Sequence, residues 1–436
     1  MTLIAASPHD LTVAPWALVP FVLLLLAIAI LPLVAAKWWH SNLRRALLAL
    51  GLALPVAGYL GYLQLAEQQP GFAALQHTAI EYVDFMVLLA ALYTVAGGIA
   101  VQGQFRPTPL VNVGFLALGA VLANVIGTTG ASILLIRPLL RINLVRQNRS
   151  HLPIFFIFIV SNLGGLLTPL GDPPLLLGFL NGIDFFWTLS MWPIWLTVNG
   201  IVLAIALAWD AIAYWREPDL SHFPPRHGSV VIGGGINVLF LAGILAAVLV
   251  QSPVLAGDYR LERPWPSVIM AAMALLSWLF TSRSVREHNH YSWEPIVEVA
   301  ILFAGIFVTM VPALALLSRH SDDLGVSEPW HYFWLTGILS SWLDNAPTYL
   351  AFTALAAGDQ PLASLSLNQP LVLQAISAGA VFMGANTYIG NGPNFMVKSM
   401  AEGMGYAMPS FFGYLVYSTL ILLPVFALAT WLFFVP

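Results

Sequence analysis

Apolar runs long enough to cross a bilayer, separated by short polar stretches, recur along the whole chain. They cover residues 13–36, 46–64, 81–101, 109–140, 152–180, 185–213, 230–251, 265–281, 295–317, 330–357, 370–398 and 409–435. A helix needs about 20 consecutive apolar residues to cross the hydrocarbon core. The pattern therefore predicts an all-α polytopic membrane protein without a sizeable soluble domain.

Two of these segments, 109–140 and 330–357, are interrupted midway by polar residues together with glycine or proline. Non-helical backbone at membrane depth is tolerated only where protein or a water-filled cavity surrounds it. We therefore expect each to form a re-entrant helical hairpin that enters and leaves on one side. Glycine and proline also interrupt 152–180 and 370–398, and these segments are predicted to be broken transmembrane helices.

The second half of the chain repeats the order of features in the first half. At one constant offset, Glu81 corresponds to Glu298, and ANVIGTTGAS at 123–132 corresponds to SSWLDNAPTY at 340–349. SNLGGLLTPLGDPP at 161–174 has a shorter counterpart in ANTYIGNGPN at 385–394. The predicted topology gives the two copies opposite directions, and such inverted-topology repeats with broken helices are the architecture of secondary transporters.

The repeat divides the chain into four parts. In each repeat an acidic residue, Glu81 or Glu298, is predicted to open the first helix. The parts are the N-terminal transmembrane helices at 1–65, the first inverted repeat at 66–215, the connecting transmembrane helices at 216–293 and the second inverted repeat at 294–436.

Composition supports a membrane protein and excludes several other classes. The chain is 59% hydrophobic and 8% charged, whereas soluble domains average about 25% charged residues. Without cysteine there is no disulfide, thiolate metal site or thiol nucleophile. The absence of HExxH, GxSxG and phosphate-loop patterns argues against an enzyme or an ATP-driven pump, and nucleic acid is not an expected partner.

The distribution of basic residues predicts the orientation of the chain. With the N-terminus outside, all of the 16 Lys and Arg residues except Arg260, Arg263 and Arg319 fall in inner loops, as the positive-inside rule requires. The N-terminal segment has no basic region before its apolar run, so we expect a retained first helix rather than a cleaved signal. We expect the protein in the inner membrane of a bacterium.

Broken helices leave carbonyl groups unpaired at one half-helix end and N–H groups unpaired at the other. Carbonyls and neutral side-chain oxygens suit a hard cation such as Na⁺ or Li⁺, whereas N–H ends favour an anion. The first candidate site comprises Thr128, Thr129, Ser161, Asn162 and Thr168, and its mate comprises Asp344, Asn345, Thr348, Asn386, Thr387, Asn391 and Asn394. The residues expected to hold Na⁺ most directly are Asp344, Asn345, Asn162 and Asn386.

Intramembrane carboxylates are the candidates for proton coupling, because a charge at the centre of a membrane helix costs about 2.5–3.5 kcal/mol on insertion scales. Asp344 ranks first because it lies at a hairpin tip, followed by Asp172, Glu298 and Glu81. The alternatives are structural: Glu81 and Glu298 as acids at helix starts, and Asp172 as the cap of a following half-helix.

Three motifs resemble the ion transporter superfamily, and within it most closely the citrate transporters and NhaD-type sodium:proton antiporters. They are SNLGGLLTPLGDPPLLLGFL at 161–180, LDNAPTYLAF at 343–352 and GANTYIGNGPNFMVKSMAE at 384–402. The resemblance implies two inverted repeats, each with a re-entrant hairpin and an unwound Ser-Asn-Thr-like signature. It also implies a homodimer in the lipid bilayer that works by an elevator-type movement.

The chain departs from these relatives at two places. NhaD-type antiporters carry Asp-Asn in both hairpins, but the first hairpin here has Gly127-Thr128, so Asp172 is the residue that could compensate. Carboxylate transporters have Ser where this chain has Ala385. We therefore expect a cofactor-free Na⁺/H⁺ antiporter, with a sodium- or proton-coupled citrate or dicarboxylate transporter as the alternative, and an ion channel or intramembrane enzyme ranked below both.

Overall fold

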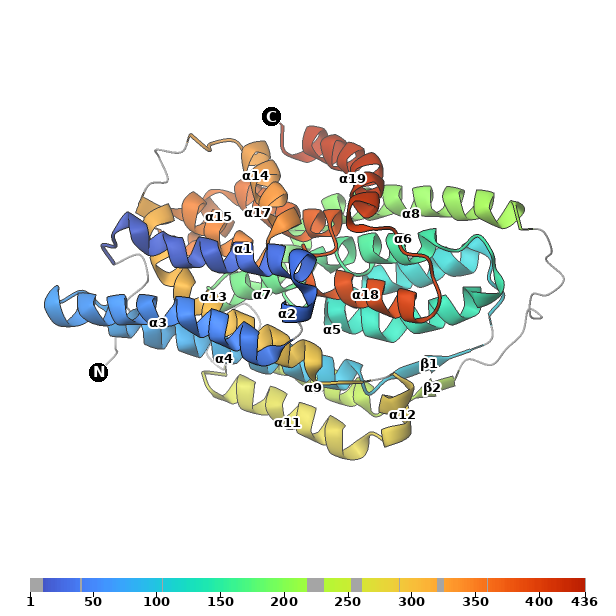
Figure 1. The fold of residues 1–436 in the computed structure, drawn as a ribbon, viewed down its shortest axis with the longest axis horizontal. Helices are drawn as coiled ribbons and strands as arrows, with labels where there is room; N and C mark the ends of the chain where they lie inside the picture. Colours follow the sequence, from blue (N-terminus) through green and yellow to red (C-terminus); the bar gives the residue numbers. More distant parts are fainter. Residues whose placement is uncertain are drawn as a thin grey trace.

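The computed structural model describes residues 11–39, 41–103, 105–217, 231–251, 261–289, 291–319, 325–358 and 360–435 (Figure 1). The helices are α1 (Val19–Val34), α2 (Ala36–Trp39), α3 (Asn42–Ala66), α4 (Gly71–Ala96), α5 (Pro109–Ile142), α6 (His151–Ile159), α7 (Pro173–Leu180), α8 (Trp192–Trp215), α9 (Asn237–Leu249), α11 (Trp265–Phe280), α12 (Arg283–His288), α13 (Glu294–Arg319), α14 (Pro329–Trp342), α15 (Asn345–Ala357), α16 (Leu365–Asn368), α17 (Pro370–Met383), α18 (Gly392–Gly403) and α19 (Phe411–Phe433).

Short 3₁₀ turns and one small β-ribbon complete the described elements. The 3₁₀ turns are η2 (Pro15–Leu18), η3 (Asn143–Val145), η4 (Leu163–Leu166), η5 (Phe185–Met191), η8 (Leu362–Ser364) and η9 (Gly384–Asn386). The ribbon pairs β1 (Ala100–Gln102) with β2 (Val231–Gly233) in antiparallel register, Ala100 opposite Gly233. Apart from this ribbon, the described fold is helical, as the sequence predicts.

Each of the predicted apolar segments contains helix, and many of these helices are long enough to cross a membrane. In the described part of the chain, 7 helices meet this criterion, or 8 if the pair bent by 118° at Gln369 counts as one span. The prediction of a helix start at Glu81 is wrong, because α4 begins at Gly71. Gln76 and His77 lower the hydropathy of this first part, but nothing between Gly71 and Ala96 breaks the helix. Glu298 likewise lies inside α13, which begins at Glu294.

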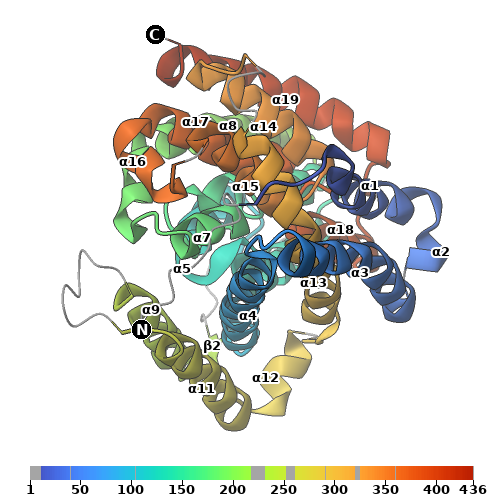
Figure 2. The same ribbon diagram turned by 90° about the vertical axis from the view of Figure 1, so that its left-hand side faces the viewer.

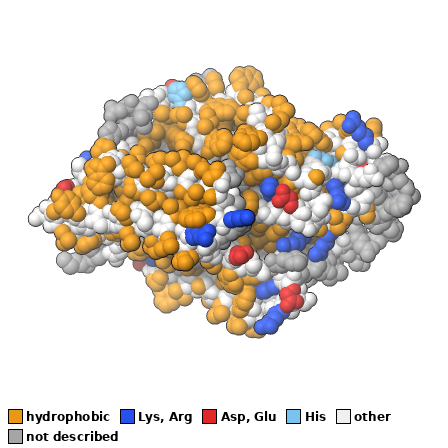
Figure 3. All heavy atoms as spheres, in the orientation of Figure 1, with side chains coloured by type: hydrophobic (Ala, Val, Ile, Leu, Met, Phe, Trp, Pro, Cys, Tyr) orange, Lys and Arg blue, Asp and Glu red, His pale blue; other side chains and the backbone are white. Residues whose placement is uncertain are grey.

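The outer surface is apolar in the manner of a protein surrounded by lipid. Along α3 the side chains of Leu43, Leu47, Leu50 and Leu54 are between 53% and 69% exposed. Figure 3 shows hydrophobic side chains covering most of the left-hand half of this face, with Lys and Arg gathered mainly on the right-hand half. An apolar surface this extensive is unfavourable in water and favourable in a bilayer, so the chain is a multi-pass membrane protein.

The helices form two groups. Figure 2 shows α9 and α11 on one side of the molecule, α8, α14, α17 and α19 on the opposite side, and α4 and α13 between them. Helix α11 packs against α4 and α9, and α13 packs against α3, α4 and α15. In the second group α14 packs against α17, and α8 packs against α19.

The interrupted segments lie deep inside the molecule. Every residue in 151–166 is buried, and so is every residue in 375–388. Helix α5 contains a break at Gly127, whose φ of 77° and ψ of 156° belong to no helix and favour glycine. Leu343 and Asp344 separate α14 from α15. The irregular backbone within 151–166 and 375–388 is thus enclosed by protein, whereas Gly127, Leu343 and Asp344 are partly exposed.

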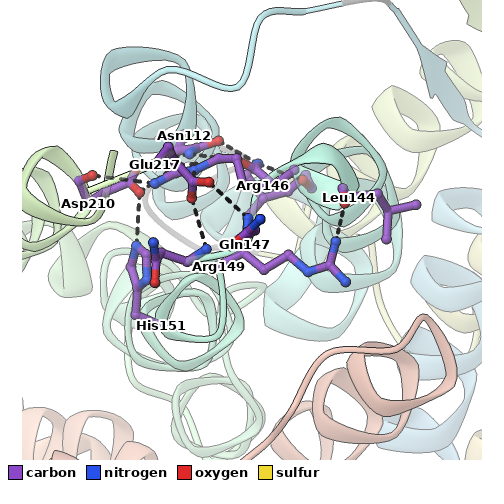
Figure 4. Close-up of polar contacts among 11 residues, drawn as sticks. Asn112, Leu144, Arg146, Gln147, Arg149, His151, Asp210 and Glu217 are labelled. Carbon is purple, nitrogen blue, oxygen red and sulfur yellow. Dashed lines mark hydrogen bonds and ion pairs between the residues drawn. The ribbon is translucent and has the colours of Figure 1, made fainter. Parts of the chain in front are cut away.

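A buried ionic cluster joins the end of α8 to the turn between α5 and α6 (Figure 4). Arg146 Nη1 lies 2.6 Å from Asp210 Oδ1, and both side chains are almost fully buried. Asn112 Nδ2 donates to Asp210 Oδ2 at 2.7 Å, and His151 Nε2 lies 2.9 Å from Asp210 Oδ1. Asp210 therefore binds three partners from α5, the α5–α6 turn and α6.

The same cluster extends to the segment that follows α18. Glu217 accepts the backbone N–H groups of Gln147 and Asn148 at 3.0 and 2.8 Å. Arg149 packs over the ring of Tyr406, with its guanidinium carbon 4.6 Å from the ring centroid. The α5–α6 turn is thereby held between the end of α8 and the chain after α18.

We predict that Asp210→Asn destabilises the protein strongly. The substitution removes the 2.6 Å ion pair of Arg146 and leaves it only the longer 3.7 Å pair with Glu217, and breaking a buried ion pair costs up to about 3–5 kcal/mol of unfolding free energy. Denaturant unfolding in detergent, followed by tryptophan fluorescence, measures the change.

The matched control is Glu402→Gln, which breaks the 3.0 Å pair between Lys398 and Glu402, whose side chains are 21% and 45% exposed. An exposed pair of this kind contributes less than about 1 kcal/mol. Equal effects of the two substitutions would contradict the structural role given to Asp210.

Candidate functional site

Asp172 is buried inside the molecule, where the chain between α6 and α7 is unwound. Asp172 is 2% exposed and occupies the N-cap position of α7, and Pro173 follows at the first helical position. The residue before Asp172 must be glycine, because the backbone at 171 packs closely against the backbone at 165. A Cβ on Gly171 would lie 2.1 Å from the carbonyl oxygen of Gly165. The sequence Gly-Asp-Pro thus places one carboxylate in the protein interior.

Three neutral side chains donate hydrogen bonds to this carboxylate. Thr128 Oγ1 donates to Asp172 Oδ1 at 2.8 Å, and Asn391 Nδ2 donates to the same oxygen at 3.0 Å. Asn345 Nδ2 donates to Asp172 Oδ2. Both carboxylate oxygens are therefore bound by groups that come from three other broken elements.

Each of these residues stands at the start of a half-helix. Thr128 follows the break at Gly127 in α5, Asn345 is the first residue of α15, and Asn391 is the N-cap of α18. The first N–H groups of a helix carry a partial positive charge. Together with the start of α7 at Asp172 itself, four half-helix starts lie around one carboxylate, which they bind through side chains, and the partial charge of the helix N-termini adds to these bonds.

A second set of amides surrounds the first. Asn391 Nδ2 also lies 3.2 Å from Asn162 Oδ1 and 3.1 Å from the carbonyl oxygen of Ser161. Asn162 Nδ2 donates to Asn394 Oδ1 at 2.7 Å. Ser161 Oγ lies 2.9 Å from Ser132 Oγ. The structure therefore brings together residues that the sequence assigned to two separate half-sites.

The unwound backbone of the two halves is held by matching contacts. Thr168 Oγ1 donates to the carbonyl of Asn124 at 2.5 Å, and Thr387 Oγ1 donates to the carbonyl of Ser341 at 2.5 Å. The separation between Thr168 and Thr387 along the chain equals that between Asp172 and Asn391. The two unwound segments therefore keep the same register relative to each other over this stretch.

Side chains of α8 and α19 bind the unwound carbonyls with the same spacing. In the first half, Trp195 Nε1 donates to Gly164 at 2.8 Å and Asn199 Nδ2 to Leu163 at 3.0 Å. In the second half, the Tyr414 hydroxyl donates to the Ala385 carbonyl at 2.8 Å, and the Ser418 hydroxyl donates to the Asn386 carbonyl at 2.7 Å. Asp172 and Asn391 are 219 positions apart in the sequence, and Trp195 and Tyr414 are separated by the same number of positions, as are Asn199 and Ser418.

Other predicted ligands make local contacts instead of joining the Asp172 network. Asp344 is partly exposed, and its Oδ1 accepts the backbone N–H of Ala346 at 3.0 Å as the N-cap of α15. Thr348 Oγ1 donates to the Asp344 carbonyl at 2.9 Å. Asn386 Nδ2 donates to Ser341 Oγ at 2.9 Å. Of the four residues expected to hold Na⁺, only Asn345 bonds to Asp172 and only Asn162 bonds to Asn391.

The two glutamates lie away from this network. Glu298 on α13 forms an ion pair with Arg45 at 3.1 Å and is 37% exposed at its side chain. Glu81 on α4 is buried, and its Oε2 lies 3.7 Å from His77 Nδ1. Neither residue is among the hydrogen-bond partners of Asp172 in the described part of the chain.

A small cavity of about 30 Å³ lies beside Asp172. Thr128 and Thr129 line it together with Leu88 and Leu92 of α4. Its volume suits one water molecule or one dehydrated ion. Thr129 therefore faces the same space as Asp172.

Asn124 and Ser341 are site residues that the sequence predictions omitted. Asn124 Nδ2 donates to the Gly164 carbonyl at 2.7 Å, and its Oδ1 accepts the N–H of Leu167 at 2.8 Å. Ser341 Oγ donates to the Met383 carbonyl at 3.0 Å. Each is a polar residue about one turn before a break, at Gly127 in α5 or between α14 and α15, and the offset that aligns these two segments pairs one residue with the other. That coincidence is the signal by which they could have been found.

The electrostatics of the site are those of a cation or proton acceptor. Within the described residues Asp172 forms no ion pair, its three hydrogen-bond donors are neutral, and the nearby Asp344 carboxylate acts on it as a like charge. Hydrogen bonds and helix N-termini offset only part of the desolvation cost of a buried carboxylate that has no cationic neighbour. The carboxylate can be stabilised by a bound proton or by a bound cation, and both would use the same two oxygens.

Comparison with known proteins agrees with a transporter. The sequence model of one family, described as "Putative citrate transport", matches residues 10–434, which is nearly the whole chain. No curated protein matches the chain significantly. The match covers the broken helices, the unwound segments and the cluster around Asp172, and the chain belongs to this citrate-transporter-like ion transporter family.

Proposed function

We propose that the protein is a secondary active transporter that exchanges Na⁺ for H⁺, with Asp172 as the residue that binds both. The observation that carries this proposal is a buried carboxylate bound only by neutral donors from the other broken elements. A proton and a Na⁺ ion cannot occupy the same carboxylate oxygens together. Their competition for Asp172 would couple the movement of one to the opposite movement of the other.

The neutral oxygens around Asp172 support Na⁺, with Li⁺ as the other candidate cation. Asn345 is 1% exposed, and its Oδ1 is a buried acceptor for which the described residues provide no donor. Asn386 Oδ1 is likewise a buried acceptor without a donor among the described residues. Hard cations prefer oxygen ligands. We infer that Asp172, Thr128 and Asn345 hold the cation and that Asn386 serves a neighbouring position.

This assignment changes the order of the carboxylates predicted from the sequence. Asp344 ranked first there, but its carboxylate caps α15 at the partly exposed surface of the site. Asp172 is more deeply buried and contacts residues of α5, α15 and α18. We therefore assign the coupling proton to Asp172, whereas Asp344, Glu81 and Glu298 have other roles.

We infer that the transport movement uses two inverted repeats with re-entrant hairpins. The support is the constant spacing between matching contacts, such as those of Thr168 and Thr387. In addition, α4 packs against α13 and α8 against α19, as symmetric mates would. Elevator-type alternating access by a homodimer, an inner-membrane location and an outside N-terminus complete the proposal.

Coupled transport of citrate or another carboxylate is the second candidate, and the family description favours it. The helix N-termini that meet at the site would also suit an anion. Against this candidate, the protein's own carboxylate already lies at the meeting point, and no Lys or Arg of the described chain pairs with it there.

We predict that Na⁺ added to reconstituted vesicles loaded with a pH-sensitive dye evokes proton movement in the opposite direction. Since both ions compete for Asp172, the Na⁺ concentration for half-maximal activity should rise as pH falls, by up to about tenfold per pH unit where the protonated form predominates. Silence with both Na⁺ and Li⁺, together with uptake of labelled citrate, would favour the second candidate.

We further predict that Asp172→Asn reduces Na⁺/H⁺ exchange to the level of protein-free vesicles, because the amide binds neither a proton nor a cation as the carboxylate does. Asp344→Asn should retain exchange within about tenfold, since Asn caps a helix as well as Asp. The same dye assay measures both variants.

Glu298→Gln is the matched control, because its carboxylate lies outside the Asp172 network and is 37% exposed at the side chain. It should exchange ions at the wild-type rate. The opposite ranking, with Asp344→Asn inactive and Asp172→Asn active, would overturn the assignment of the proton to Asp172.

A further inference from the structure

We propose that the half-helix starts around Asp172 form a carboxylate-binding cradle and that Asp172 is its resident occupant. Removal of this side chain would leave a site for a small free carboxylate such as acetate or formate. Residue 172 would then determine whether the site accepts a cation or a carboxylate. The inference rests on the proposed function for its transport readout, whereas its binding readout stands independently.

The first argument is that both carboxylate oxygens of Asp172 are bound as a free anion would be. Oδ1 accepts from Thr128 at 2.8 Å and from Asn391 at 3.0 Å, and Oδ2 accepts from Asn345. None of the donors is charged, so the attraction for an anion comes from directed hydrogen bonds and from the helix N-termini behind them.

The second argument is that the cradle does not depend on Asp172 for its shape. Asn391 Nδ2 also contacts the Ser161 carbonyl and Asn162 Oδ1, at 3.1 and 3.2 Å. The backbone N–H of Thr128 donates to the carbonyl of Gly171 at 2.8 Å. These contacts use other atoms than the Asp172 carboxylate, so they persist when that side chain is shortened.

The third argument is space and backbone geometry. The cavity of about 30 Å³ beside Asp172 adjoins Thr128, so a free anion would gain room in addition to the vacated side-chain volume. Asp172 has φ −146° and ψ 147°, which is extended backbone that any residue adopts. Gly or Ala at this position therefore introduces no backbone strain.

The cradle also connects the site to the family description. A family described by citrate transport needs a place for a carboxylate group, and in this chain Thr128, Asn345 and Asn391 at the half-helix starts would provide its donors. Here the protein supplies that carboxylate itself. An anionic substrate would have to displace or neutralise Asp172, whereas a cation would find an anion already in position.

The test measures thermal unfolding of the purified variants Asp172→Gly and Asp172→Ala in detergent. Acetate replaces the methylene and carboxylate missing from the Gly variant, and formate replaces the carboxylate missing from the Ala variant. Each variant should gain about 2 °C or more in unfolding temperature from its matching anion, because a ligand that binds only the folded state stabilises it. Chloride at equal ionic strength should give no such shift.

Asp172→Asn and the wild type are the controls, because in both the cradle is filled and acetate should have no specific effect. Absence of an anion-specific shift in both shortened variants would overturn the proposal, and so would an equal shift in Asp172→Asn. Recovery of folded Gly variant only from acetate-containing buffer would support it. Aggregation of both shortened variants with the anions present would count against it, since a filled cradle should hold together.

A transport readout separates this inference from the proposed function. Acetic acid crosses bilayers and carries protons, so uptake of radioactive sodium replaces the pH dye. Acetate binding to Asp172→Gly with restored sodium uptake supports both proposals. Binding without restored uptake supports the cradle and contradicts the cation role of the carboxylate at this position.

Discussion

The structure depends on a carboxylate that is buried inside a membrane protein without a cationic partner among the described residues. Asp172 is held by Thr128, Asn345 and Asn391, and each of these residues begins a half-helix. Intact helices could not bring these groups together, because their first turns would lie near the membrane surface. The breaks in the helices are therefore the means by which the site is made.

Unwinding a helix inside a bilayer leaves backbone carbonyls that need donors, since no lipid can supply them. Here α8 and α19 provide these donors, with Trp195 and Asn199 on the first unwound segment and Tyr414 and Ser418 on the second. Glycines allow the close approach that places Asp172. The stability of the unwound segments and the geometry of the site thus come from the same polar contacts.

The site reconciles two chemistries that otherwise point in different directions. Converging helix N-termini are suited to an anion, and the family is described by citrate transport. In this chain the anion at that point is the side chain of Asp172. A negatively charged internal group turns an anion cradle into a position for a proton or a metal cation, which is the physical basis of the proposed exchange.

Local sequence patterns were sufficient to predict the helical segments and the breaks at Gly127 and Asp344, because a bilayer leaves few alternatives to apolar helices. They also drew attention to the intramembrane polar residues, several of which the fold brings together around Asp172. The first part of α4 was missed because Gln76 and His77 lower local hydropathy. That Asp172, rather than Asp344, meets the other half of the chain emerged only from the folded arrangement. The reason is that the contact between Asp172 and Asn391 spans 219 residues, and no local pattern specifies which of several buried carboxylates such a contact will select.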